Sequence, residues 1–257
     1  MGCAVTLTLA LAAAPGTAGP VPVRFTEGVV HGFLLLSTLD GTRIANGDLL
    51  QAVSGDRVIA RLVFHFKDGS LHDETATFSQ RRQFRLISSR LVQKGPAFAM
   101  PMDLTIDCMK HVVTARYTDD GKEKVETSND ALPPDLSNGL MLTLLKNIRP
   151  TAGAQLSLMA ATPKPMLVKI EVTSSGEEPF TVAGSSRKAF HYVVHPDLGG
   201  LKGLLASIIG KTPPDTHVWI LGGEAPAFVK SEGPLYVGGP AWRIELAAPT
   251  WPAAARD

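Results

Sequence analysis

Residues 57–66, RVIARLVFHF, decide the fold class of this chain. On an extended strand, one face of this stretch carries only apolar side chains, at positions 58, 60, 62, 64 and 66. The other face carries Arg57, Arg61 and His65 together with Ile59 and Val63. An alternation with a period of two is typical of a strand that has one face in the core and the other in water.

Similar stretches lie on both sides of this strand at intervals of roughly ten residues. The sequence predicts strands at VVHGFLLLST (29–38), LHDETATFS (71–79), RQFRLISSRLV (82–92), PMDLTID (101–107) and HVVTARYT (111–118), and then at AQLSLMAA (154–161), MLVKIEV (166–172), PFTVAG (179–184), RKAFHYVVHP (187–196), THVWILG (216–222), AFVKSEG (227–233) and WRIELA (242–247).

Turns are expected where Gly follows or precedes Asp or Asn, which is the strongest local hairpin signal. They fall at Leu39-Asp40-Gly41, Asn46-Gly47-Asp48, Ser54-Gly55-Asp56, Lys67-Asp68-Gly69 and Asp119-Asp120-Gly121. We therefore expect a mainly β protein built on a curled antiparallel sheet. An open barrel, a half-barrel and a sandwich all remain compatible with this pattern.

Two amphipathic helices are expected among the strands. The first covers 136–148, with Asp135 or Ser137 as its N-cap and Arg149-Pro150 at its end. The second covers 199–210, GGLKGLLASIIG, where several glycines weaken an apolar stripe. A marginal helix over an apolar surface suits a lid.

The length and the composition suit one soluble domain. The chain has 257 residues, of which 44% are hydrophobic, and a net charge of +1. We expect a single β-rich domain over 21–250 with a tail at 251–257, and a split near 149–151 is the alternative. The near-zero charge gives no reason to expect nucleic acid as a partner, and no run is long enough for a transmembrane helix.

The first 20 residues have no charged side chain and run through small apolar residues into a Pro/Gly break. This pattern predicts a signal peptide at 1–20 and a periplasmic or secreted protein. Loss of the leader would remove Cys3 and leave Cys108 without a disulfide partner.

The C-terminal half carries a further pattern. Val182-Ala183-Gly184 is followed by the strand from Ala189 to Val194 and by the segment from Trp219 to Lys230, and PPDLSNGLMLTLLKNIRP (133–150) stands at mid-chain. In these parts the chain resembles a group of uncharacterised periplasmic β-rich bacterial proteins. The resemblance implies a half-barrel, broadly similar in shape to lipoprotein-carrier folds, and it implies no catalytic residue.

An apolar ligand site is the leading functional expectation. The loop 94–102 is bounded by Pro and rich in Met, a residue type that suits adaptable apolar binding, and a loop that folds over the core is the alternative. The two helical stripes could cap an open half-barrel. The expected ligand-binding residues are Phe98, Met100, Met102, Leu140, Met141, Leu144, Leu201, Leu204, Leu205, Ile208 and Trp219.

Polar clusters support other chemistry less well. His65, His72, Asp73 and Glu74 lie around one hairpin, where His72 and Glu74 share a face, and we interpret them as a solvated hairpin tip. His191 and His195 share a face of another strand, but no G-x-S-x-G elbow accompanies them. The four Arg of RRQFRLISSR (81–90) suit a polar outer face.

These patterns favour a non-enzymatic binding or carrier protein for an apolar or lipid-like ligand. No catalytic residue, metal ligand or cofactor is assigned. The alternatives are a cell-envelope interaction module without a small ligand, and a hydrolase that uses His65, His72, His191 or His195.

Overall fold

The computed structural model describes residues 17–182, 185–197 and 213–247. Within these ranges every strand belongs to one sheet. The strands are β1 (Thr17–Ala18), β2 (Val30–Thr38), β3 (Arg43–Ser54), β4 (Arg57–Phe66), β5 (Leu71–Gln80), β6 (Phe84–Lys94), β7 (Met102–Asp107), β8 (Val112–Asp119), β9 (Lys122–Ser128), β10 (Ala154–Ala160), β11 (Met166–Val182), β12 (Ser185–Asp197), β13 (Thr216–Leu221), β14 (Ala227–Pro234) and β15 (Ala241–Leu246).

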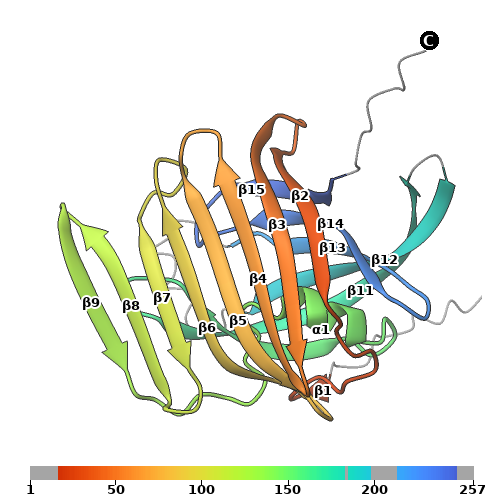
Figure 1. The fold of residues 1–257 in the computed structure, drawn as a ribbon, viewed down its shortest axis with the longest axis horizontal. Helices are drawn as coiled ribbons and strands as arrows, with labels where there is room; N and C mark the ends of the chain where they lie inside the picture. Colours follow the sequence, from red (N-terminus) through yellow and green to blue (C-terminus); the bar gives the residue numbers. More distant parts are fainter. Residues whose placement is uncertain (1–16, 183–184, 198–212, 248–257) are drawn as a thin grey trace, which may run out of the picture.

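The sheet consists of two antiparallel meanders joined in its middle. Its order is β1-β10-β11-β12-β13-β14-β15-β2-β3-β4-β5-β6-β7-β8-β9, so β15 pairs with β2 and the sheet is not closed. Only the two-residue β1 pairs in parallel, with β10. Figure 1 shows β2–β9 in front, β10–β15 behind them, and the helix α1 (Met141–Asn147) between the two. The sheet is therefore curled around its own core.

The alternation that was read from residues 57–66 is confirmed. Val58, Ala60, Phe64 and Phe66 are buried on the inner face, whereas Arg57, Arg61 and His65 are exposed. Most expected strands have close counterparts, and the mainly β, antiparallel character of the sheet is as predicted. The stretches 166–172 and 179–182 instead belong to the single strand β11 (Met166–Val182), which continues past a bulge between Ser174 and Gly176, and the last two residues of the expected strand 179–184 lie outside the described residues.

The turn expected at Asn46-Gly47-Asp48 is wrong, because these residues lie inside the strand β3. Gly47 is buried opposite Phe64, and a Cβ at this position would lie 2.4 Å from the Phe64 ring. The glycine therefore makes room for a core aromatic side chain instead of forming a turn. The other four turn signals do separate neighbouring strands, and their glycines have positive φ angles.

The first expected helix is shorter than the sequence pattern suggested. It starts at Met141, not at 136, and no side chain caps it. Asp135 and Ser137, the expected caps, bond instead to Ser157 on β10. Gly139 then has a φ of +69°, which an α-helix does not allow. Among the described residues α1 is the single α-helix, and the expected helix at 199–210 falls outside them.

The main core fills the space inside the curl. The inner faces of both meanders contribute to it, and so do Leu140, Leu144, Leu145 and Ile148 from and around α1. The hydroxyl of Tyr192 on β12 donates a hydrogen bond to the carbonyl of Ile148 at 2.9 Å, which ties the helix end to the second meander. No helix in the parts of the chain described is long and apolar enough to cross a bilayer.

Candidate functional site

A row of partly accessible side chains crosses the middle of the inner face of the first meander. Leu49, Leu62, Glu74 and Leu91 are direct neighbours on β3, β4, β5 and β6. Each retains intermediate exposure. The row above consists of Gly47, Phe64, His72 and Gln93, the row below of Gln51, Ala60, Ala76 and Ser89, and all eight of these residues are buried. In a fully packed interior the middle row would be as buried as its neighbours, so these leucines, which pack against the main core, still keep accessible area on the inner face.

Glu74 places a carboxyl group among the leucines of this row. Burial of the carboxyl raises its pKa to about 7, and a hydrogen bond from the backbone of Gly139 only partly offsets the rise. The residue as a whole is partly accessible, but its carboxyl group is desolvated because its cross-strand neighbours on this face are Leu62 and Leu91. A carboxyl group with this pKa changes its charge near neutral pH.

Gly139 reaches Glu74 because it has no side chain. A Cβ on Gly139 would lie 2.6 Å from the Cβ of Ala76, the next inner residue of β5. The positive φ of Gly139 also turns its backbone away from helical geometry. The chain before α1 therefore passes directly over Ala76 and Glu74.

His72 lies one row above, on the same strand and face as Glu74. It is 3% exposed, and burial lowers its pKa to about 4. Its Nδ1 lies 3.0 Å from the side-chain nitrogen of Gln93, whereas its Nε2 is buried without a hydrogen-bond partner. The rings of Phe64 and Phe98 flank it at centroid distances of 6.1 and 6.4 Å.

A groove with a volume of 430 Å³ lies beyond Phe98 at one end of the curl. Phe66, Ala97 and Trp242 line its apolar wall. The ring of Phe98 contacts Phe66 edge-on at 5.4 Å on this side and stacks on His72 on the other. Phe98 thus lies between Phe66, which lines the groove, and the ring of His72.

The loop that carries Phe98 is held by the neighbouring hairpin. The backbone N–H of Ala97 donates to the hydroxyl of Ser70 at 2.8 Å, and Gly95 approaches Ser70 so closely that a Cβ there would lie 2.6 Å from its Cα. Polar anchoring of one loop end leaves the apolar side chains of the loop free to face the interior.

The structure brings together part of the expected apolar ligand-binding set. Phe98, Met102, Leu140 and Leu144 are buried in the main core, and Met100 and Met141 pack against it. Trp219 is on the outer face of β13, since its neighbour Val218 belongs to the main core. Leu201, Leu204, Leu205 and Ile208 lie outside the described residues.

The interpretation of the 65–74 hairpin as a solvated tip is wrong for two of its members. His65 and residues at the turn, such as Lys67 and Asp68, are exposed as expected. His72 and Glu74 do share a face, and it is the inner one. His65 and Asp73 are on the outer face, where Asp73 pairs with Arg61 at 2.7 Å. Over the residues that the structure describes, no three His, Cys, Asp or Glu side chains are grouped so as to hold a metal ion.

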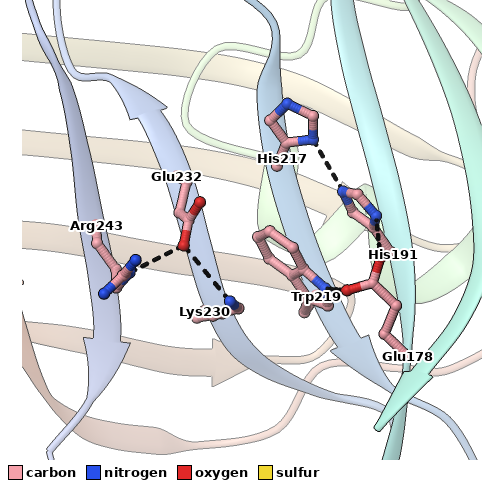
Figure 2. A network of polar contacts seen from close by, with 7 residues as sticks. All are labelled: Glu178, His191, His217, Trp219, Lys230, Glu232 and Arg243. Atoms are coloured by element: carbon pink, nitrogen blue, oxygen red, sulfur yellow. Dashed lines mark hydrogen bonds and ion pairs between the residues drawn. The ribbon is translucent and has the colours of Figure 1, made fainter. Parts of the chain in front are cut away.

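His191 belongs to a polar network on the outer face of the second meander (Figure 2). Its Nδ1 lies 2.8 Å from the Glu178 carboxylate, and its Nε2 lies 2.9 Å from Nδ1 of His217. The His191 ring stacks on Trp219 at 4.4 Å, and the Trp219 indole N–H donates to the other Glu178 oxygen at 2.7 Å.

The network continues across β14 to β15 and is satisfied internally. The Lys230 ammonium lies 3.9 Å from the Trp219 ring, and Glu232 accepts hydrogen bonds from Lys230 and Arg243. His195 bonds separately to Asp215 at 2.7 Å. The hydrogen-bond partners of these histidines are carboxylates and another histidine, not a hydroxyl or thiol, so the geometry is that of a structural network across the five strands β11–β15.

The leucines of the accessible row were missed by sequence reasoning. Leu62 alternates in the same way as its buried neighbours Ala60 and Phe64, so nothing in the sequence distinguishes it. Only the cross-strand register brings it beside Glu74. The chain matches no known protein family, no curated protein and no solved structure.

Proposed function

We propose that the protein binds a mainly apolar small molecule on the inner face of its curled sheet and acts as a binding or carrier protein. The observation that carries the proposal is the accessible row Leu49, Leu62, Glu74 and Leu91 between two buried rows. Accessible leucines inside a curl offer apolar area that a ligand can bury, at roughly 25 cal/mol per Å².

The groove beside Phe98 supports the same proposal. Aromatic residues line it or stand directly behind it, and the partly buried Met100 is in the adjoining loop. A flexible thioether side chain can repack around an entering ligand. Export of the protein to the periplasm or beyond remains part of the proposal, on the evidence of the first 20 residues alone.

A hydrocarbon fluorophore tests the proposal directly. Diphenylhexatriene, which fluoresces in apolar surroundings, should bind saturably to the wild-type protein. Leu62→Trp should fill the accessible row and weaken binding at least about tenfold. Ile59→Trp is the matched control, because Ile59 is on the same strand but is 48% exposed on the outer face. Circular dichroism should show that both variants are folded.

Two outcomes contradict the proposal. One is the absence of saturable binding by the folded wild-type protein. The other is equal binding by the Leu62 and Ile59 variants. Native mass spectrometry of the protein purified from its host should, in addition, find a co-purifying apolar molecule that Leu62→Trp loses.

A further inference from the structure

The protonation of His72 can be derived from its neighbours. The side-chain nitrogen of Gln93 lies 2.8 Å from the carbonyl oxygen of Leu235 and 3.0 Å from Nδ1 of His72. A carbonyl oxygen only accepts, so the Gln93 amide must present its NH₂ group to both. Nδ1 of His72 is then an acceptor and carries no proton.

The second ring nitrogen must therefore carry the hydrogen. His72 is neutral at neutral pH because burial holds its pKa at about 4. A neutral imidazole with a bare Nδ1 has its N–H at Nε2. This N–H is the buried atom without a partner, so the inner face contains an unused hydrogen-bond donor of defined identity.

The surroundings of this donor restrict what can accept from it. The rings of Phe64 and Phe98 flank it, and Leu62 and Leu91 are one row away. Glu74 is two residues along the same strand, about 7 Å distant. It is the one other ionisable side chain on the inner face in these two rows of β3–β6, because Arg61, Asp73 and Arg90 lie on the outer face.

We propose that the ligand carries a neutral hydrogen-bond acceptor, an ester or amide carbonyl on an apolar body, and that the Nε2–H of His72 donates to it. The inference rests on the proposed function and names the ligand class for the same site. A carboxylate would be repelled by Glu74 above neutral pH. An ammonium group would be attracted by the Glu74 carboxylate, but as a donor it would leave the N–H of His72 without an acceptor. A neutral carbonyl satisfies the donor without adding charge to an apolar interior.

Access to His72 requires movement of Phe98. This ring stands between Phe66, which lines the groove, and the imidazole, and it is carried by a loop between Gly95 and Pro101. Rotation of the ring toward the groove would expose Nε2 and leave the Ser70 anchor of the loop in place. The ligand's apolar body would then extend along the leucine row.

Competition against diphenylhexatriene tests the ligand class. Methyl palmitate should displace the fluorophore at a concentration at least about tenfold below that needed for hexadecane, palmitate or hexadecylamine, at pH 8. His72→Leu removes the donor, so methyl palmitate and hexadecane should displace the fluorophore from this variant at the same concentration. His65→Leu is the matched control, because His65 is exposed on the outer face of the same hairpin.

A second measurement does not depend on the variant. The ¹⁵N spectrum of the imidazoles should show His72 as the neutral tautomer protonated at Nε2, and methyl palmitate, but not hexadecane, should shift that resonance. Equal displacement by ester and hydrocarbon, preference for the acid or the amine, or an ester preference that survives His72→Leu would each overturn the inference and leave the apolar site intact. If no compound and no fluorophore binds, the proposed function itself fails.

Discussion

Gly47 shows that one sequence pattern can be compatible with two local structures. In the Asn46-Gly47-Asp48 context it resembles a turn, yet it lies in β3 against Phe64. Gly47→Ala would force a methyl group to within 2.4 Å of the Phe64 ring and of the Val63 carbonyl oxygen. We expect a loss of about 2–3 kcal/mol in the free energy of unfolding, as for other overpacked cores.

The measurement is urea unfolding of the Gly47 variant beside Gly28→Ala. A Cβ on Gly28 would have no other atom within 4 Å, and the φ of Gly28 is not positive, so this substitution should be close to neutral. Equal effects of the two substitutions would mean that Phe64 can move aside.

Glu74 and His72 should give the protein opposing pH dependences. The folded pKa of Glu74 is about 7, above the ordinary 4.5, so the folded state keeps a proton that the unfolded state releases and stability falls as the pH rises from 4.5 to 7. The folded pKa of His72 is about 4, below the ordinary 6.5, so its contribution to stability is lost as the pH falls from 6.5 to 4. Between pH 4.5 and 6.5 the two effects offset each other.

Single substitutions should uncover each slope. Glu74→Gln should leave a protein whose stability rises with pH between 4 and 6.5. The stability of this variant relative to the wild type should also increase between pH 4.5 and pH 8, by up to about 3 kcal/mol at 1.36 kcal/mol per pKa unit. His72→Gln should leave a protein whose stability falls between pH 4.5 and 7. The measurement is urea unfolding from pH 4 to 8, with Glu123→Gln on the exposed strand β9 as control. Identical profiles for all four proteins would refute the assignment of both pKa values.

At the level of elements, the segment before α1 is held by β10 and not by helical bonding. The side chain of Asn138 accepts a hydrogen bond from the Met159 N–H and donates one to the Met159 carbonyl, each at 2.9 Å. Asn138→Ala would leave both buried backbone groups of Met159 without these partners. The expected loss is about 2–4 kcal/mol, because each buried unsatisfied group costs about 1–3 kcal/mol.

Asn129→Ala provides the matched control, because Asn129 is exposed after β9. Thermal unfolding should show a clearly lower midpoint for the Asn138 variant and almost none of this shift for the Asn129 variant. Since Asn138 immediately precedes Gly139, the Asn138 variant should also bind diphenylhexatriene more weakly. Unchanged stability would show that water replaces the amide.

For the whole molecule, the β15–β2 pairing joins the two meanders into one sheet. Trp242 on β15 pairs with Thr38 on β2 and packs in the main core, in contact with Phe66 at 5.4 Å. All three Trp residues are in the C-terminal half of the chain. The fluorescence of Trp219 and Trp242 therefore reports the second meander and its junction with the first, whereas far-UV circular dichroism reports both meanders.

We expect the two signals to follow the same urea transition, because the β15–β2 pairing and a main core shared by both meanders hold the halves together. Trp251→Phe would confine the fluorescence signal to Trp219 and Trp242, which are in the described sheet. A fluorescence transition that clearly precedes or follows the dichroism would mean that the halves unfold independently near 149–151, the alternative that the sequence left open.

Local sequence patterns were sufficient for most strands, for most turns and for the inner face of β4, but they missed β3 and β9 and divided β11 into two strands. They were also sufficient to place His72 and Glu74 on one face, because the side-chain period of a strand is two residues. These features depend on neighbours within a few positions along the chain.

Only the tertiary structure shows that the face with His72 and Glu74 points into the curl. It alone also determines the length of α1 and which residues form the site. Leu49, Leu62 and Leu91 meet Glu74 through pairings between separate strands, and the tautomer of His72 depends on Leu235, 142 residues from Gln93. Such contacts leave no periodic trace in the sequence, because each is set by strand register and by the curl of the whole sheet. The sequence around His72 therefore does not distinguish a buried hydrogen-bond donor from a solvated hairpin tip, because burial depends on how the sheet folds.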